Sequence, residues 1–437
     1  MLKSLCPRLL HVFTLLVLAA LPTAYATSAV TISVDNETVL SYPAGMDTLA
    51  DEHTTIIPIG DPKDPSCYRF FVASDTAASG DTLTGTVVLE TKDLVNFDFA
   101  KGFGDPAEGG LVLRSPVVFN DCSFAGGSVF DQNYAAPGSV LYDPTRGPGH
   151  MLMLYEAEQH CNGTTFNHDF YASIGFARSW DNGHTWPQPG HYGTQRYPVI
   201  QVPGTIPSGP PPQGGSWPNM GDALPSGFID KVPVACKFGF PCFPDYFLYT
   251  LYTDTGTQTT PPDGYLRVAR AQLGGEDPLL FRKWNNGSWS GAGIGGPDSK
   301  VTSIKGCGDN AAQIMSQITY NEELNAYLLT FVCVNVNNGV QTQGGWYFST
   351  ATSLETQDWT DPQPIQGTQG DITNYFPPTG AACGHGMSFD GWYPSFMSPR
   401  FEAGHTGMYG KVFYTYGCDG SLGRQFMSRD FKITVSP

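Results

Sequence analysis

The strongest constraint on the fold of this chain is a pattern of strands that recurs five times. Each copy has a short opening strand, a longer apolar strand, a third strand and an outer one, joined by turns. The opening strands begin near residues 53, 135, 223, 311 and 393, a spacing of roughly eighty to ninety residues. The apolar second strands are, in chain order, YRFFVASD, HMLMLYEAEQH, YFLYTLYTD, AYLLTFVCVN and KVFYTYGCD. Such repetition predicts similar structural units arranged in series.

The residues within each copy favour β-structure. Each strand is short, rich in β-branched and aromatic residues, and bounded by Gly, Pro, Asp or Asn, and no segment keeps a helical period. Five four-stranded antiparallel units predict an all-β fold, the five-bladed β-propeller, because radial packing of the blades leaves only short, protected edges. A β-sandwich with long insertions is the alternative fold.

The N-terminal residues have the three-part layout of a secretory signal peptide. Lys3 and Arg8 precede an apolar run from Leu9 to Leu21, and the small residues around Ala26 follow. The apolar run is too short to span a bilayer. We therefore expect residues 1–26 to be removed, residues 27–437 to form a single propeller domain, and the mature protein to be a secreted, extracellular monomer.

Cysteines and glycosylation sequences agree with export. Sequons at Asn36, Asn162 and Asn286 predict a glycoprotein. Ten cysteines are present, and one of them lies in the signal peptide, so we expect disulfide bonds and one unpaired cysteine. Cys236 and Cys242 bracket the sequence KFGFP, where a disulfide would close a small loop. Their spacing lacks the paired Cys/His pattern of a zinc site, and we assign no metal ligand.

The charge of the chain argues against polyanionic partners. Forty acidic residues against 23 basic ones give a formal net charge of −17, which disfavours nucleic acid and anionic membranes as partners. Charged residues make up only 14% of the chain, whereas Gly, Pro and aromatic residues are plentiful. This composition is typical of a loop-rich extracellular β protein.

The repeat layout resembles that of the five-bladed propeller glycoside hydrolases, which include arabinanases, β-xylosidases, fructan-cleaving enzymes and D-arabinan-cleaving relatives. The resemblance covers residues 45–437, and SWDNGHTW (Ser179–Trp186) has the S-x-D-x-G-x-T-W pattern of an Asp box, a structural turn of propeller blades. The resemblance implies a hydrolase that cleaves a polysaccharide or oligosaccharide, with furanoside or pentose linkages favoured. It implies no required cofactor, and it permits a calcium ion in an oxygen-lined central channel.

Members of this group place acids or bases where the innermost strands begin and where the second strands return to the same face, around a central funnel. The matching positions at the strand starts here are Asp47, Asp51, Asp222, Asp309 and Asp390. Those at the ends of the second strands are Asp75, Glu156, Glu158, Asp254, Asn335 and Asp419. The chain departs from the pattern at Tyr134–Pro137 and at Leu224-Pro225, where relatives often carry carboxylates, so the subfamily and the bond cleaved stay open.

The end of the second copy's apolar strand, EAEQH, suits acid–base chemistry. Alternate residues of a strand share a face, so Glu156, Glu158 and His160 follow the apolar side chains of the same face. Glycoside hydrolysis needs two carboxyl groups in different protonation states, and apolar surroundings raise the pKa of a glutamate. We expect Glu158 to donate the proton and Asp51 or Asp222 to act as base or nucleophile. The simpler alternative is a strand that ends in solvent.

Further residues are expected to bind the substrate, since aromatic rings pack against the C–H faces of sugars and polar groups bind their hydroxyls. They are Glu156, His160, Tyr134, Trp217, Asp309, Asp390 and Trp392. Each has a structural alternative: aspartates cap turns, tryptophans pack between blades, and histidines are often buried and hydrogen-bonded. Two other functions also stay open, a polysaccharide lyase on the same scaffold and a non-catalytic carbohydrate-binding propeller.

Overall fold

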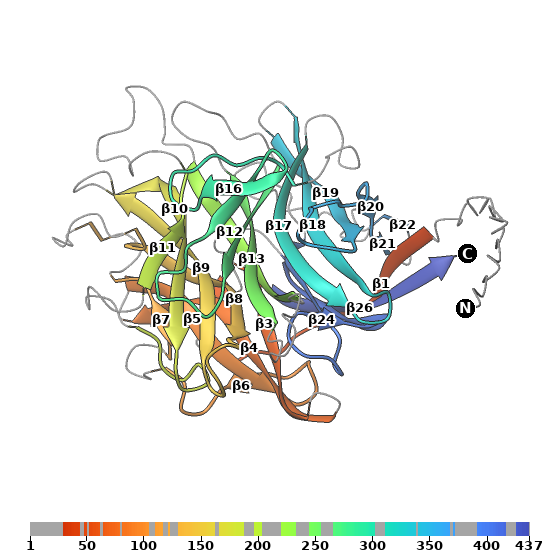
Figure 1. The fold of residues 1–437 in the computed structure, drawn as a ribbon. Coiled ribbons are helices and arrows are strands. Elements are labelled where there is room, and N and C mark those ends of the chain that lie inside the picture. The colour runs from red at the N-terminus through yellow and green to blue at the C-terminus, as the bar shows by residue number, and fades with distance from the viewer. Residues whose placement is uncertain are drawn as a thin grey trace, which may run out of the picture.

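The computed structural model describes part of the chain, namely residues 29–43, 48–49, 52–61, 64–78, 81–104, 110–116, 121–122, 130–161, 166–187, 196–202, 220–232, 244–254, 265–301, 311–337, 340–367, 370–371, 391–416 and 425–436. Within these ranges the chain forms strands and turns and no helix, which confirms the expected all-β fold (Figure 1). Accordingly, none of the described segments is a helix that could cross a membrane. The predicted signal peptide, residues 1–26, lies outside the described residues.

The strands follow one another as antiparallel meanders in the order of the sequence copies. The first contains β3 (Thr55–Asp61), β4 (Asp64–Ala78), β5 (Asp81–Thr91) and β6 (Asp98–Phe99), with the short strands β2 (Thr48–Leu49) and β7 (Leu113–Arg114) beside β4 and β5. The second contains β8 (Tyr134–Tyr142), β9 (Met151–Cys161), β10 (Phe166–Ser179) and β11 (Arg196–Ile200). The third contains β12 (Met220–Val232), β13 (Asp245–Asp254), β14 (Leu266–Gln272), β15 (Arg282–Asn285) and β16 (Ser288–Ala292).

The last two meanders complete the series. The fourth contains β17 (Ala311–Asn321), β18 (Ala326–Asn337), β19 (Val340–Ala351) and β20 (Gln363–Pro364), and the short strand β24 (His405–Thr406) pairs with β17. The fifth contains β23 (Trp392–Met397), β25 (Tyr409–Tyr416), β26 (Gln425–Ser436) and β1 (Ala29–Val39), and β21 (Gln366–Gly367) and β22 (Gly370–Asp371) extend it beyond β1. Strand β1 therefore comes from the opposite end of the chain to β26, and Figure 1 shows the two side by side.

The hydrogen-bonded sheets do not match the copies one for one. A two-pair parallel ladder between β10 and β12 joins the second and third meanders into one sheet. The β1 segment also precedes the first sequence copy and was not expected to belong to the fifth meander. The sheet pattern thus agrees with the order of the copies but does not itself establish five separate blades.

The second strand of each meander is buried on both faces, which explains why these strands are so apolar. In β4, Phe70 and Phe71 are both fully buried and enter different apolar clusters, because successive side chains point to opposite faces of a strand. In β9, Met153 and Leu154 are divided in the same way. A strand packed on both faces needs apolar residues at every position, and not at alternate ones.

Five apolar clusters lie between successive meanders, and the fifth returns to the first. They join meanders one and two (Phe71, Val88 with Met153, Tyr155), two and three (Leu154, Phe176 with Leu248, Ala269), three and four (Tyr249, Leu251 with Leu329, Phe331), four and five (Leu328, Val332 with Val412, Tyr414), and five and one (Phe413, Phe426 with Phe70, Val72). The core is therefore a circular series of inter-sheet layers.

The innermost strands are also tied to one another by side-chain-to-backbone hydrogen bonds. The pairs are Val140 N to Thr55 Oγ1 (2.9 Å), Gly227 N to Ser139 Oγ (2.7 Å), Phe396 N to Gln317 Oε1 (2.7 Å) and Thr54 N to Ser395 Oγ (3.0 Å). Three of these strands carry a β-bulge at a residue with positive φ, namely Leu224, Met315 and Tyr393. A bulge re-aims the backbone, and all three residues pack in the apolar cluster between meanders four and five.

The cysteines and sequons are described in part. Cys122 and Cys161 form a disulfide bond, Cys333 is also disulfide-bonded, and Cys67 is free. Cys236 and Cys242 lie outside the described residues, so their pairing stays a prediction. Asn36 and Asn286 are exposed, as glycosylation would require, and Asn162 lies outside the described residues.

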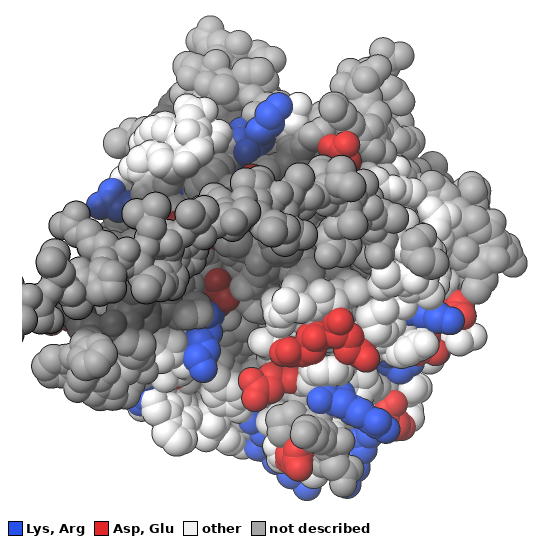
Figure 2. All heavy atoms as spheres, turned by 45° about the vertical axis from the view of Figure 1, so that its right-hand side comes forward, with Lys and Arg blue, Asp and Glu red and all other residues white. Residues whose placement is uncertain are grey.

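Charges of both signs share the described surface. On the face drawn in Figure 2, red acidic side chains lie close to blue basic ones. Pairs such as Lys411 and Asp430, whose Nζ and Oδ1 atoms are 2.7 Å apart, offset the acidic excess locally.

Candidate active site

The structure describes six of the residues expected at the site. Asp51, Trp217, Asp309 and Asp390 lie outside the described residues, and their roles stay predictions. Tyr134, Glu156, Glu158, His160 and Asp222 lie at one end of the second and third meanders. Trp392 is the first residue of β23 and is half-buried against the cluster between meanders four and five.

Three glutamates meet where β9 ends. Glu156 and Glu158 lie near the end of β9, and Glu52 lies just before β3. The side chain of Glu156 hydrogen-bonds with those of both Glu52 and Glu158. All three residues are buried, with 1, 2 and 6% of Glu52, Glu156 and Glu158 exposed. Two carboxyl groups form a hydrogen bond with each other only when one of them carries a proton. Each of these two contacts in the glutamate cluster therefore requires a proton between its two carboxyl groups.

Glu156 is a member of the cluster whose surroundings favour the protonated form. Its pKa is raised to about 8, mainly by burial and also by the neighbouring charge of Glu158. Hydrogen bonds from Glu52 and from the Leu224 amide, whose nitrogen lies 2.5 Å from Glu156 Oε2, act in the opposite direction. That amide is available because Leu224 occupies the bulge of β12. Glu156 thus links the second and third meanders.

His160 and Asn133 fix the position of Glu158. The Nε2 atom of His160 lies 2.7 Å from Glu158 Oε2, so the ring can donate a hydrogen bond to this carboxylate. The fully buried Asn133 accepts from the His160 amide at 3.0 Å and donates its own backbone N–H to the Glu158 carbonyl at 3.0 Å. Its side-chain nitrogen donates to the carbonyl of Asp121, next to the disulfide-bonded Cys122. The end of β9 is therefore buried and held by these hydrogen bonds, and it does not end in solvent.

Asp222 is fully buried in an ion-pair network beside the cluster. Its Oδ2 atom lies 3.2 Å from Lys283 Nζ, and Lys283 also lies 3.4 Å from Asp298 Oδ2. The pKa of Asp222 is raised to about 7, first by burial, while the charge of Lys283 opposes this shift. Its Oδ1 atom has no hydrogen-bond partner among the described residues. These contacts would hold a carboxylate in place, and its catalytic role stays a prediction.

The backbones beside Asp222 and Glu158 approach each other through the sheet. Glu158 pairs with Ala172 of β10, and Ala172 pairs with Gly221 of β12. Two strand spacings place the backbones of Glu158 and Gly221 about 10 Å apart. The backbones of these two segments are therefore close, whereas the approach of the Asp222 carboxyl group to Glu158 stays a prediction.

The aromatic residues expected at the site are less exposed than a sugar platform would be. Tyr134 pairs with Glu158 across the strands and is only 7% exposed, next to Ala73 and Ala136. Trp392 contacts Tyr393 with their ring centroids 6.0 Å apart. Both residues border the region, and binding of a substrate by either one stays a prediction.

Glu52 is the residue of the cluster that the sequence analysis missed, although it directly follows Asp51. The copies can be aligned on five polar residues of the inner strands, Thr55, Ser139, Ser226, Gln317 and Ser395, of which all but Ser226 accept the hydrogen bonds between inner strands. The residue three positions earlier is then Glu52 in the first copy and Ala136, Ala223, Ile314 and Trp392 in the others. A single carboxyl group at a position that is otherwise apolar is the signal that could have identified it.

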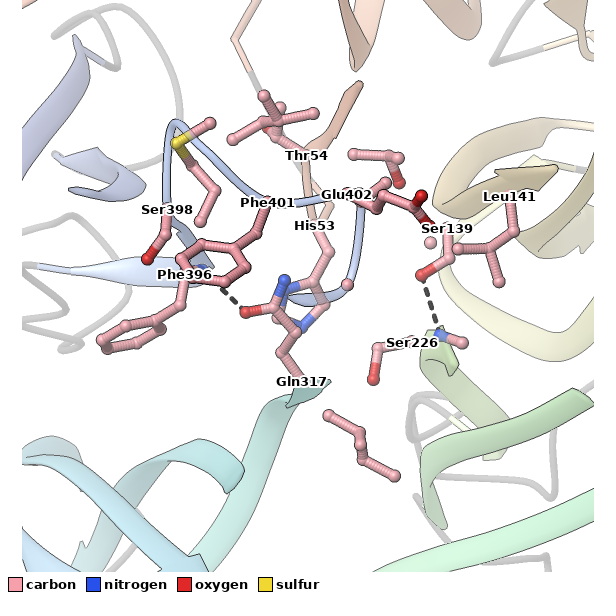
Figure 3. Close-up of a pocket in the computed structure, with 18 of the residues that line it drawn as sticks. His53, Thr54, Ser139, Leu141, Ser226, Gln317, Phe396, Ser398, Phe401 and Glu402 are labelled. Carbon is pink, nitrogen blue, oxygen red and sulfur yellow. Dashed lines mark hydrogen bonds between the residues drawn. The ribbon is translucent and has the colours of Figure 1, made fainter. Parts of the chain in front are cut away.

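A small central cavity lies beside His53, the residue after Glu52. Its volume is about 30 Å³, and Ser139, Ser226 and Gln317 contribute to its lining. Figure 3 shows the His53 ring among these residues, beside Phe401. Burial lowers the pKa of His53 to about 3, so the ring is neutral, and it contacts Tyr393 edge-on. Neither ring nitrogen has a hydrogen-bond partner among the described residues.

A calcium ion in the central channel, which the family resemblance permits, stays a prediction. Calcium binds six to eight oxygen atoms, usually including carboxylates. The described cavity offers hydroxyl and amide oxygens, imidazole nitrogens and one carboxylate, that of Glu402 (Figure 3). No group of three or more His, Cys, Asp or Glu residues in the described ranges is placed to hold a metal ion. We therefore derive no step through a metal.

No protein-family model matches the chain, and no curated protein matches it in sequence. Solved structures resemble it at low identity. An N-acetylgalactosamine deacetylase from F. plautii, in complex with blood group B trisaccharide, is 11% identical (TM-score 0.47, 92% of this chain and 95% of that chain). An α-L-arabinofuranosidase from Fusarium graminearum is 10% identical (TM-score 0.42, 91% and 98%). An arabinanase from Bacillus subtilis is 13% identical (TM-score 0.34, 87% and 95%). Because these likenesses are weak, function is argued below from the residues of the site.

Proposed function

We propose that this chain is a secreted glycoside hydrolase built on a five-bladed β-propeller, and that it cleaves a polysaccharide or oligosaccharide with furanoside or pentose linkages favoured. The circular order of the five apolar clusters and the hydrogen bonds between inner strands support the propeller. The Cys122–Cys161 disulfide supports an extracellular location, because such bonds persist in oxidising compartments.

The observation that carries the proposed chemistry is the glutamate cluster. Its central member, Glu156, has a pKa raised to about 8, and it hydrogen-bonds with Glu158 and Glu52. Glycosidases need a carboxylic acid that stays protonated at the working pH and a second carboxylate nearby. The raised pKa of Glu156 supports a proton source in the cluster, and Asp222 or Asp51 would supply the second carboxylate.

In the proposed mechanism, Glu158 donates the proton to the oxygen of the leaving sugar, and Glu156 shares its proton with Glu158. His160 orients the Glu158 carboxyl group through their 2.7 Å contact. Asp222 or Asp51 acts as base or nucleophile.

A product screen tests the proposal. The secreted protein would be incubated with arabinan, xylan, fructan, galactan and fungal wall glycans, beside Glu158→Gln, Glu156→Gln and Glu355→Gln. Glu355 is a matched control, because its side chain is 55% exposed and pairs with Arg270 on the outer part of the third meander. We expect the parent and the Glu355 variant to release sugars, and the Glu158 variant to lose about 10²-fold or more in rate, as expected for loss of a general acid.

Other outcomes identify the alternatives. Binding of a glycan without release, in the parent and in all variants, would indicate a carbohydrate-binding protein and contradict the hydrolase. Products that absorb in the ultraviolet would indicate a lyase, since hydrolysis creates no double bond. Equal release by the parent and Glu158→Gln, with unchanged thermal stability, would exclude Glu158 as the essential acid.

A further inference from the structure

A second hollow lies at the other end of the inner strands. Its volume is about 860 Å³, and residues from the ends of β3, β8, β12 and β17 line it. Along β8, Tyr134 pairs with Glu158 at the glutamate cluster, whereas Tyr142 pairs with Met151 and lines the hollow. The two tyrosines are eight positions apart along an extended strand, which corresponds to a distance of about 26 Å. The hollow is therefore separate from the proposed active site.

Aromatic side chains line much of this hollow, and we call it the aromatic hollow. Its rings belong to Tyr142, Phe228, Tyr246, Tyr320 and Tyr327. Tyr142 is 42% exposed, whereas Phe228 is buried and forms part of the floor. The Phe228 and Tyr327 centroids are 5.8 Å apart and those of Tyr320 and Tyr327 are 5.0 Å apart, both edge-to-face. An apolar wall of this kind, with polar atoms at its edges, is typical of a ligand site.

Hydrogen bonds hold the polar ends of these side chains in place. The Tyr327 hydroxyl donates to Asp230 Oδ1 at 2.7 Å, and the Tyr320 hydroxyl donates to Asn325 Oδ1 at 2.5 Å. His405, which also lines the hollow, lies 2.6 Å from Glu322 through its Nδ1 atom. A ligand would therefore meet two rings, those of Tyr320 and Tyr327, that are already ordered, which reduces the entropy lost on binding.

The charges around the hollow favour a neutral ligand with hydroxyl groups. Asp230 and Glu402 contribute two carboxylates, and Lys231 contributes one cation. Burial is the main cause that raises the pKa of Asp230, and its other neighbours include Arg270 and Glu355. An anionic ligand would be repelled by these carboxylates and by the net charge of −17. Carboxylates accept hydrogen bonds from hydroxyls, and Asp230 and Glu402 provide two carboxylates for a ligand with hydroxyl groups.

We propose that the aromatic hollow binds a neutral carbohydrate chain at a site separate from the glutamate cluster. The C–H faces of sugar rings would pack on Tyr142 and Tyr246, and sugar hydroxyls would bind Asp230 and Glu402. The choice of carbohydrate rests on the proposed function, whereas the site itself rests on the residues of the hollow. Such a site would hold a polymer on the enzyme while the glutamate cluster, at the opposite end of the inner strands, acts on another segment or chain.

Affinity electrophoresis tests this proposal. Glu158→Gln, in which cleavage is blocked, would serve as the parent and would run through gels containing arabinan, xylan or galactan, with anionic polygalacturonate as a comparison. Tyr142→Ala and Tyr246→Ala would be added to it separately. Tyr409→Ala is the matched control, because Tyr409 is 64% exposed and does not line the hollow. We expect at least one neutral polysaccharide to retard the parent, and each hollow variant to bind it about two- to tenfold more weakly.

The outcomes separate this proposal from the proposed hydrolase. Retardation that depends on Tyr142, in a protein that releases no sugar in the product screen, would support the hollow and contradict the hydrolase. Equal retardation of Tyr142→Ala and Tyr409→Ala would overturn the hollow as a carbohydrate site, whatever the product screen shows. Retardation by no neutral polysaccharide would also overturn it. So would sedimentation showing that Tyr142→Ala dissolves a dimer, since a second copy of the chain would then occupy the hollow.

Discussion

At the scale of single residues, Glu156 gives a direct test of the site through the pH dependence of folding. Its pKa rises from 4.5 to about 8 on folding. Between these values the folded chain keeps a proton that the unfolded chain has lost. This contribution to stability is therefore complete below pH 4.5 and is lost as pH rises through 8.

Glu156→Gln removes this titration, so its free energy of unfolding should fall less than that of the parent between pH 5 and pH 8. From pH 5 to pH 8, the free energy of unfolding of the parent should fall by about 1–4 kcal/mol more than that of Glu156→Gln. Urea unfolding at several pH values measures it, and Glu355→Gln, an exposed side chain, should keep the parent slope. Equal slopes for the parent and Glu156→Gln would show that Glu156 is ionised in the folded chain.

The same residues show how far a sequence predicts a site. Strand alternation correctly brought Glu156, Glu158 and His160 to one side of β9, because that relation is local. Glu52 was missed because its contact with Glu156 joins two different meanders, and nothing in the residues around position 52 indicates that partner. The ion pair of Asp222 with Lys283 is also non-local, so a sequence cannot distinguish an aspartate free to react from one held by a cation.

At the scale of elements, β9 carries the site and is anchored at its end by a disulfide. Cys161 is the last residue of β9 and directly follows His160, and its bond to Cys122 closes a sequence separation of 39 residues. Closing a loop of this size stabilises a folded chain by about 4 kcal/mol in the chain-entropy description. It also holds Asp121, the acceptor for Asn133, beside the strand.

The double variant Cys122→Ser with Cys161→Ser should therefore have a lower thermal stability. It should also lose part of the pH-dependent free energy of unfolding that comes from Glu156, because the end of β9 is no longer anchored. We expect calorimetry to show a thermal midpoint lower by several degrees, on the order of 4–10 °C. Cys67→Ser is the control, because this free, half-buried cysteine lies in β4 and should leave the midpoint nearly unchanged. A double variant as stable as the Cys67 variant would show that the disulfide does not anchor β9.

At the scale of the whole molecule, the sequence copies predicted the order of the meanders but not that strand β1 completes the fifth meander. The apolar second strands were recognisable because burial on both faces demands an apolar run. Strand β1 was not predicted, because its partner β26 lies at the far end of the sequence and the β1 segment precedes the first copy. Its alternating pattern is nevertheless present in the residues, since Ile32 and Val34 are buried and Thr31 is exposed.

This closure by β1 gives the last prediction. Ile32 packs in the apolar cluster between meanders four and five, so Ile32→Ala should lower the free energy of unfolding by about 2–4 kcal/mol, whereas Thr31→Ala on the exposed face should change it by less than about 0.5 kcal/mol. If the meanders form a closed ring, loss of this contact weakens the ring as a unit, and calorimetry should still show one transition at a lower temperature. An early separate transition in Ile32→Ala, with the rest of the chain melting at the parent temperature, would instead show that β1 and the fifth meander unfold independently, which a closed five-bladed propeller does not allow.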